Sequence, residues 1–369
     1  MMATTYLVLV NNVLNELNEP ELTSTTFSSS RGIQTAVKKF VLKSMHEIYS
    51  SLSEVPDLYK STTQDTQTGQ RTYALPSAAS PQSGDLAYRK VDWDTFRLVP
   101  KELLTNGEFT SDISSWTNAT TGAVGDGTPA YNSGGNGRCR LNDAAVSQAI
   151  STVKNKAYRI QVRVVDSSSG GSSLAIKVGT SAHDTTDLSD TVSVTNYGEG
   201  NILDTIFTAS VATTYVTVIN SDANNLDIDY IRISEDMPVK KLRYITYDDW
   251  NTKYLERDLT NSESSFGRPD YVYPTQDKKF GLSPVPDQSN YSIQYEYWKI
   301  HTDLSAHGDT MDLDDRFKDL IITRSNYHAY KLRSDPQAAQ MAYAEYEKLL
   351  QIMRSEYINT KSYMRDTRI

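Results

Sequence analysis

The chain has 369 residues, a formal net charge of −9, a single cysteine and an apolar fraction of 38%. This length allows two domains with separate cores. The negative charge disfavours a nucleic-acid or anionic-membrane binder, because such proteins use clustered Lys and Arg. Cys139 alone excludes an intrachain disulfide framework and fits assembly in a reducing compartment. No stretch is long and apolar enough for a membrane span, so we expect a soluble protein with no membrane partner.

Apolar residues three and four positions apart predict two helices near the N-terminus, a short one over residues 4–17 and a longer one over residues 31–52. Pro56 ends the second helix. Lys38, Lys39 and Lys43 lie off its apolar stripe, and we interpret them as a solvated face rather than a DNA-binding patch.

Residues 61–103 alternate short strand patterns with turns. The composition changes at residue 104, where Gly, Ser, Thr, Asn and Asp become frequent and helical periodicity disappears. Strand patterns at spacings typical of a β-sandwich follow over residues 144–150, 158–165, 174–178, 202–209, 215–220 and 226–233.

Most of the chain's negative charge lies in residues 102–236, which hold eight Lys/Arg against sixteen Asp/Glu. The earlier style resumes after residue 236 with a strand pattern at residues 240–245. We therefore predict a β-sandwich, residues 104–236, inserted into a host domain between two neighbouring strands. An insertion of this kind is tolerated when its ends lie close together.

The C-terminal third predicts a strand over residues 291–298 and two helices. The first helix covers residues 314–333, with its core face at Phe317, Leu320, Ile321 and Leu332. Asp335-Pro336 separates it from the second, because Pro is favoured in a first helical turn. In the second helix a heptad-like seam runs through Ala339, Tyr343, Tyr346, Leu350, Met353 and Tyr357.

Catalytic patterns are weak. The five histidines, at positions 46, 183, 301, 307 and 328, form no metal-spaced pair in the sequence, and no phosphate loop or nucleophile elbow is present. Adjacent acidic residues such as Asp314-Asp315 are better explained as charge at a helix N-terminus than as a glycosidase pair. We predict that the protein is not an enzyme.

The order of elements from Phe280 to Met353 resembles one family. The sequence Leu282-Ser283-Pro284-Val285-Pro286-Asp287 precedes a Tyr-rich strand, a Leu304-Ser305 kink, an Asp-rich approach to Phe317 and a final helix rich in tyrosine. This order is similar to head-to-tail adaptors of short-tailed phages, the tail tubular protein A type. The resemblance covers residues 4–103 and 237–369.

The resemblance implies an α+β fold, a helical bundle with a small antiparallel sheet, over residues 1–103 and 237–358. It also implies a structural virion protein at the head–tail junction, assembled in the host cytoplasm. Such adaptors form a ring of twelve copies between the portal protein and the tail nozzle, with tail fibres as further partners. Viral DNA passes through the ring without sequence-specific binding.

The resemblance further implies that the tail, residues 359–369, docks on the portal. The expected portal contacts are Tyr357, Lys361, Tyr363, Arg365, Arg368 and Ile369. Excess tyrosine and a seam left unpaired on the final helix suit subunit contacts in a ring. Packing of the same seam within the subunit's own bundle remains an open alternative.

The inserted region resembles jelly-roll carbohydrate-binding modules through Asn106-Gly107-Glu108-Phe109, Trp116 and the strand around Asp229. That resemblance implies a structural calcium ion held by Glu108 and Asp229, the only cofactor expected. Trp116, Tyr131 and Tyr197 are the candidates for stacking on sugars, although the family buries its tryptophan at the position of Trp116. The alternative function is therefore a carbohydrate-binding surface protein.

Overall fold

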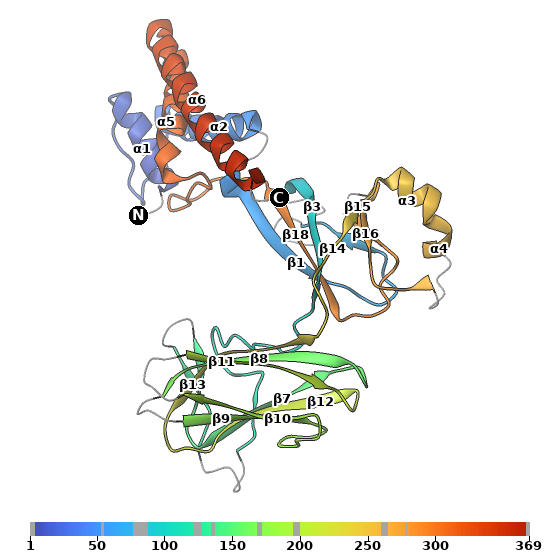
Figure 1. The fold of residues 1–369 in the computed structure, drawn as a ribbon. Coiled ribbons are helices and arrows are strands. Elements are labelled where there is room, and N and C mark those ends of the chain that lie inside the picture. The colour runs from blue at the N-terminus through green and yellow to red at the C-terminus, as the bar shows by residue number, and fades with distance from the viewer. Residues whose placement is uncertain are drawn as a thin grey trace. The chain divides into compact units, whose positions relative to one another are not determined.

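The structure is a computed structural model that describes residues 4–52, 55–76, 88–120, 127–133, 137–167, 172–194, 200–259, 265–277 and 279–366, without the side chains of 88, 89, 166, 167, 172, 194, 200 and 358–366. The chain forms two compact units. One, the helical unit, comprises residues 1–62, 74–93 and 295–369. The other, the β unit, comprises residues 63–73 and 94–294. Figure 1 shows the elements of both.

Four helices share the core of the helical unit. They are α1 (Tyr6–Glu16), α2 (Ile33–Ser51), α5 (Lys318–Leu332) and α6 (Pro336–Asp366), with short 3-10 turns η1 (Pro56–Leu58) and η3 (Asp315–Phe317). Both predicted N-terminal helices are confirmed within two residues of their expected ends. The Thr5 hydroxyl caps α1 by accepting a hydrogen bond from the Val8 N–H.

Helix α6 packs along α5 through small residues. Ala329 of α5 and Ala339 and Ala342 of α6 are all buried, which lets two helix backbones approach closely. Asp335 caps α6, because its Oδ1 accepts the Ala338 N–H at 3.0 Å. The helix runs to Asp366. The predicted boundary after residue 358 therefore falls inside a helix, because the polar sequence that follows it keeps a helical conformation without apolar periodicity.

Two four-stranded sheets accompany these helices. The first has the order β1-β18-β3-β14, and its strands β1, β18 and β3 each contribute residues to both units. The second has the order β15-β16-β17-β2. Their strands are β1 (Tyr59–Asp65), β2 (Thr72–Ala74), β3 (Tyr88–Pro100), β14 (Lys240–Lys241), β15 (Arg243–Tyr244), β16 (Tyr271–Pro274), β17 (Lys279–Ser283) and β18 (Tyr291–Lys299).

The expectation of one small antiparallel sheet is wrong in two respects. There are two sheets, and β15 pairs with β16 in parallel. The parallel pair arises because α3 (Tyr247–Lys253) and α4 (Leu255–Leu259) lie between these strands in the sequence and allow the chain to return in the same direction. Trp250 of α3 stacks on Tyr273 of β16, with ring centroids 4.5 Å apart.

The β unit also contains a sandwich of two five-stranded sheets (Figure 1). Every pairing between their strands is antiparallel. One sheet has the order β10-β9-β12-β7-β4, with β4 (Thr117–Asn118), β7 (Ala144–Ser151), β9 (Ser172–Gly179), β10 (Leu188–Val194) and β12 (Thr213–Asn220). The other has the order β11-β8-β13-β6-β5, with β5 (Ala130–Asn132), β6 (Arg138–Leu141), β8 (Ala157–Ser167), β11 (Gly200–Thr208) and β13 (Leu226–Glu235).

All six strands predicted for this region are present. Their alternate residues form one apolar core that includes Ile160, Val162 and Val164 of β8. Phe109 and Trp116 belong to the same core, with ring centroids 5.7 Å apart. The strands β4, β5, β6 and β10 lack a clear apolar alternation, so the sequence did not indicate them.

The two ends of the sandwich lie side by side. The Leu103 N–H donates to the Ile233 carbonyl at 2.8 Å, and Glu102 Oε1 accepts the N–H groups of Leu104 and Ile233. Just outside these ends, β3 and β14 pair antiparallel, with Leu98 opposite Lys240. The chain therefore leaves and re-enters one sheet at neighbouring strands, which is the geometry expected of an insertion.

Candidate functional sites

Of the six predicted portal contacts, only Tyr357 has a described side chain. It lies in the core of the helical unit, where its ring meets Phe317 edge-on at 5.4 Å. Its hydroxyl donates to Asp57 Oδ2 at 2.7 Å, and burial raises its pKa. Lys361, Tyr363 and Arg365 lie on the last turns of α6, whereas Arg368 and Ile369 lie outside the described residues. Tyr357 is thus an internal contact in this conformation.

The predicted seam of α6 is buried inside its own subunit. Tyr346, Leu350, Met353 and Tyr357 all join the core shared with α1, α2 and α5. The expectation of an unpaired seam is therefore wrong, and the alternative of packing within the subunit holds. Tyr343 was also misplaced: it is 41% exposed, because Ala342 occupies the tight contact. Leu332 of α5, assigned to the core, is 55% exposed at the helix end.

Tyr343 instead helps to enclose a cation. The Arg324 guanidinium lies 4.8, 5.4 and 4.9 Å from the ring centroids of Tyr327, Tyr343 and Tyr346. Its Nε donates to Glu47 Oε2 at 2.6 Å, so the cation links α5 and α6 to α2. The arrangement uses several of the tyrosines that make the sequence unusual, and their role here is within the subunit.

The predicted sugar-stacking residues do not form one exposed surface. Trp116 is buried, and its indole N–H donates to the Asn106 carbonyl at 3.2 Å. It therefore presents no face to a sugar. Tyr131 is 37% exposed and donates its hydroxyl proton to the Thr110 carbonyl at 3.1 Å. Tyr197 lies outside the described residues.

The predicted calcium ligands are each paired with an arginine. Glu108 Oε1 accepts a hydrogen bond from Arg232 at 2.6 Å, and Asp229 Oδ2 accepts one from Arg163 at 3.0 Å. A calcium ion needs several oxygen ligands and does not share them with guanidinium groups. As placed here, the two carboxylates do not fit a calcium site and instead hold arginines on the sandwich surface.

The turn that carries the jelly-roll resemblance is built differently from the expectation. The positive φ, 55°, belongs to Asn106 and not to Gly107. Gly107 is required for close approach, because a Cβ atom there would collide with the Ile231 carbonyl oxygen. The Ile231 N–H donates to the Gly107 carbonyl at 2.8 Å, so this turn joins the first and last segments of the sandwich.

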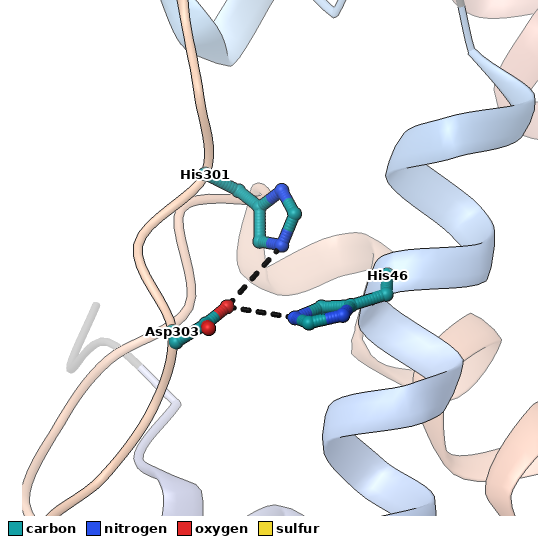
Figure 2. Close-up of side chains that lie close together, drawn as sticks. All are labelled: His46, His301 and Asp303. Atoms are coloured by element: carbon teal, nitrogen blue, oxygen red, sulfur yellow. Dashed lines mark hydrogen bonds and ion pairs between the residues drawn. The ribbon is translucent and has the colours of Figure 1, made fainter. Parts of the chain in front are cut away.

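The structure brings together a cluster that the sequence did not indicate. His46 from α2 meets His301 and Asp303 from the loop after β18 (Figure 2). His46 Nε2 lies 2.7 Å and His301 Nε2 3.4 Å from the same oxygen, Asp303 Oδ1. The side chains of His46 and Asp303 are 51% and 65% exposed, whereas that of His301 is 16% exposed. Sequence reasoning missed the cluster because 255 positions separate its two histidines.

Among the described residues, no helix is both long and apolar enough to cross a membrane. A comparison with family models gives a match to the model described as SU10 adaptor protein, over residues 169–368. The chain belongs to the SU10 adaptor protein family. The resemblance to phage adaptors is therefore confirmed, and the adaptor is a structural phage protein and a component of the virion. The match includes residues 237–368 of the expected frame and extends into the sandwich, but it does not include residues 4–103.

No curated protein matches the adaptor sequence. Solved structures that resemble part of it include a CBM4 protein, with 14% identity, 36% of this chain and 99% of that chain covered, and a TM-score of 0.30. TmCBM61 in complex with beta-1,4-galactotriose has 17% identity, 37% and 99% coverage, and a TM-score of 0.29. The carbohydrate-binding module CBM36 in complex with calcium and xylotriose has 16% identity, 32% and 98% coverage, and a TM-score of 0.25. These likenesses are too weak to carry a functional inference.

Proposed function

We propose that this protein is a ring-forming head-to-tail adaptor that joins the portal to the tail nozzle and forms part of the DNA ejection channel. The observation that carries the proposal is the adaptor family match, which covers the whole C-terminal segment from residue 237 to residue 368. The ring holds twelve copies in this proposal, as the resemblance to short-tailed phage adaptors implies.

The end of α6 is the proposed portal-binding segment. It is helical through Asp366, and positions 361 and 365 fall on the same side of a helix because they are four residues apart. Both positions are basic, Lys361 and Arg365, and Arg368 follows three residues later. A basic helix end suits an acidic groove on a partner, where opposite charges speed association and fix orientation.

A deletion of residues 358–369 tests this proposal. The deletion begins after Tyr357, so the Tyr357–Asp57 hydrogen bond and the buried face of α6 are kept. We expect the variant to keep the helical circular dichroism of the remaining chain and to lose at least tenfold in affinity for purified portal protein. Sedimentation and electron microscopy of the full chain with portal should show rings stacked on the portal.

The sandwich is the proposed accessory part of the adaptor, and its removal is the matched control. Because β3 and β14 pair directly outside it, residue 101 can be joined to residue 238 by a short Gly-Ser turn that closes a hairpin. This excision should leave portal binding unchanged. An adaptor that stays monomeric with portal present, or an excision variant that fails to bind portal while the C-terminal deletion still binds, contradicts the proposal.

A further inference from the structure

His46, His301 and Asp303 have the ligand set of a metal centre. Their ligating atoms, two imidazole nitrogens and one carboxylate oxygen, all lie within 4.8 Å of one another. In Figure 2 both histidine rings turn a nitrogen toward the Asp303 carboxylate. Ligand atoms around a tetrahedral zinc ion with bonds near 2.0–2.2 Å are about 3.3 Å apart. Small side-chain rotations therefore bring the three atoms around one ion.

The surrounding residues hold two of the ligands in place. The His301 ring stacks on the buried Tyr49 ring at 4.5 Å, with an interplanar angle of 12°. Between His301 and Asp303, the Thr302 N–H donates to Asp312 Oδ2 at 2.7 Å. Leu304 directly after the cluster is buried in the core of the helical unit. The loop is thus fixed at several points before a metal binds, which lowers the entropy that binding would cost.

His46 comes from a different and equally well-fixed element. It lies on α2 next to Met45, which is buried in the same core. The ring centroids of His46 and His301 are 4.9 Å apart. An ion bound by all three side chains would connect α2 to the loop after β18, inside a single compact unit.

The chemistry of the donors selects the kind of metal. Imidazole nitrogen suits zinc, copper and nickel, whereas calcium and magnesium take oxygen ligands almost exclusively. The exposure of His46 and Asp303 lets an ion enter from solution and leaves its remaining positions to water. We propose that His46, His301 and Asp303 bind one divalent transition-metal ion of the zinc class, which stabilises the helical unit by cross-linking α2 to the loop after β18.

The test uses tag-free full-length protein stripped of metal with EDTA, titrated with zinc chloride in a calorimeter. We expect saturation at one zinc ion per chain. Asp303→Asn and His46→Ala should each weaken the affinity about tenfold or more, because each removes one of three ligands. Both positions are largely exposed, so these variants should fold, and circular dichroism at 222 nm verifies that they do.

His307→Ala is the matched control, because His307 is an exposed histidine of the same loop region and lies outside the cluster. It should bind zinc like the parent protein. As a second readout, zinc should raise the melting temperature of the helical signal in the parent and in His307→Ala but not in His46→Ala. Magnesium chloride should have no effect in any of them.

Absence of saturable zinc binding by the parent protein overturns the proposal, and so does binding that His46→Ala and Asp303→Asn leave unchanged. The first result would make the cluster a pair of ion contacts between α2 and the loop. Portal binding is measured separately, so neither result bears on the adaptor function.

Discussion

His328 is the titratable side chain most firmly built into the helical unit. It lies on α5, is 8% exposed, and its ring stacks on Phe40 at 5.9 Å. Its Nε2 lies 3.1 Å from Glu47 Oε2. Burial lowers the pKa of His328 and outweighs the opposing effect of Glu47, while the nearby cations Lys43 and Arg324 lower it further. The folded protein therefore favours neutral His328.

This burial predicts a loss of stability in mild acid. The unfolded chain takes up a proton at this histidine near pH 6.5, but the folded chain resists it to a lower pH. The melting temperature of the helical signal should therefore fall as the pH is lowered from 7.5 to 5.5, at no more than about 1.4 kcal/mol per pH unit from this group. His328→Gln should reduce the fall, whereas His307→Gln at an exposed position should retain it.

Glu47 acts outside this pH window. Burial favours a raised pKa, but the hydrogen bonds and charges of Arg324 and His328 lower the pKa of Glu47 overall. A carboxylate with a lowered pKa contributes stability above its unfolded pKa, near 4.3, and loses it in more acidic solution. A response confined to pH values below 5 would therefore assign the acid sensitivity to Glu47 and contradict the prediction for His328.

At the scale of elements, α6 is attached to the rest of its unit near its C-terminal end by one buried polar contact. Tyr357 donates to Asp57, and Asp57 Oδ2 also accepts the Asp314 N–H at 3.1 Å. The contact therefore joins α6 to η1 and to the residue that caps η3. This arrangement positions the proposed portal-binding turns that follow.

Tyr357→Phe should lower the stability of the helical unit by about 1 kcal/mol, because it removes one hydrogen bond and keeps the ring. Chemical unfolding followed by helical circular dichroism measures the change. Tyr343→Phe is the control: its side chain is largely exposed, so its effect should be within about 0.5 kcal/mol. Equal effects of the two substitutions would show that the Asp57 contact adds nothing.

At the scale of the whole molecule, the sandwich has its own core and a closed pair of ends. Its buried residues, from Leu104 to Ile233, form a cluster separate from that of the helical unit. The hydrogen bonds between Glu102, Leu103 and Ile233 fasten its first and last segments to each other. Such a region holds the contacts needed to fold without its host.

A fragment of residues 101–236 should therefore be soluble and unfold in one cooperative transition. Phe109→Ala in this fragment should lower its stability by about 3–5 kcal/mol, since it removes a fully buried ring that packs on Trp116. Tyr131→Ala, at the half-exposed tyrosine, should cost much less. A fragment without a cooperative transition would show that the sandwich depends on the host sheets.

The sequence by itself determined the strongly periodic elements and the family. Apolar spacing located α1, α2 and α6 and the six long strands of the sandwich, because burial of one face imposes a period that local sequence records. The order of the turn, strand and helices after Phe280 pointed to the phage adaptors that the family match then confirmed. The change in composition at residue 104 marked the start of the sandwich.

Tertiary structure decided what depends on partners distant in the chain. Whether Ala342 or Tyr343 faces the core follows from how closely α5 approaches, and the parallel pairing of β15 with β16 follows from the path of the chain through α3 and α4. Glu108 and Asp229 pair with arginines whose positions only the folded sheet fixes. His46, His301 and Asp303 form one cluster for the same reason: spacing along the sequence carries no information about side chains that meet across a fold.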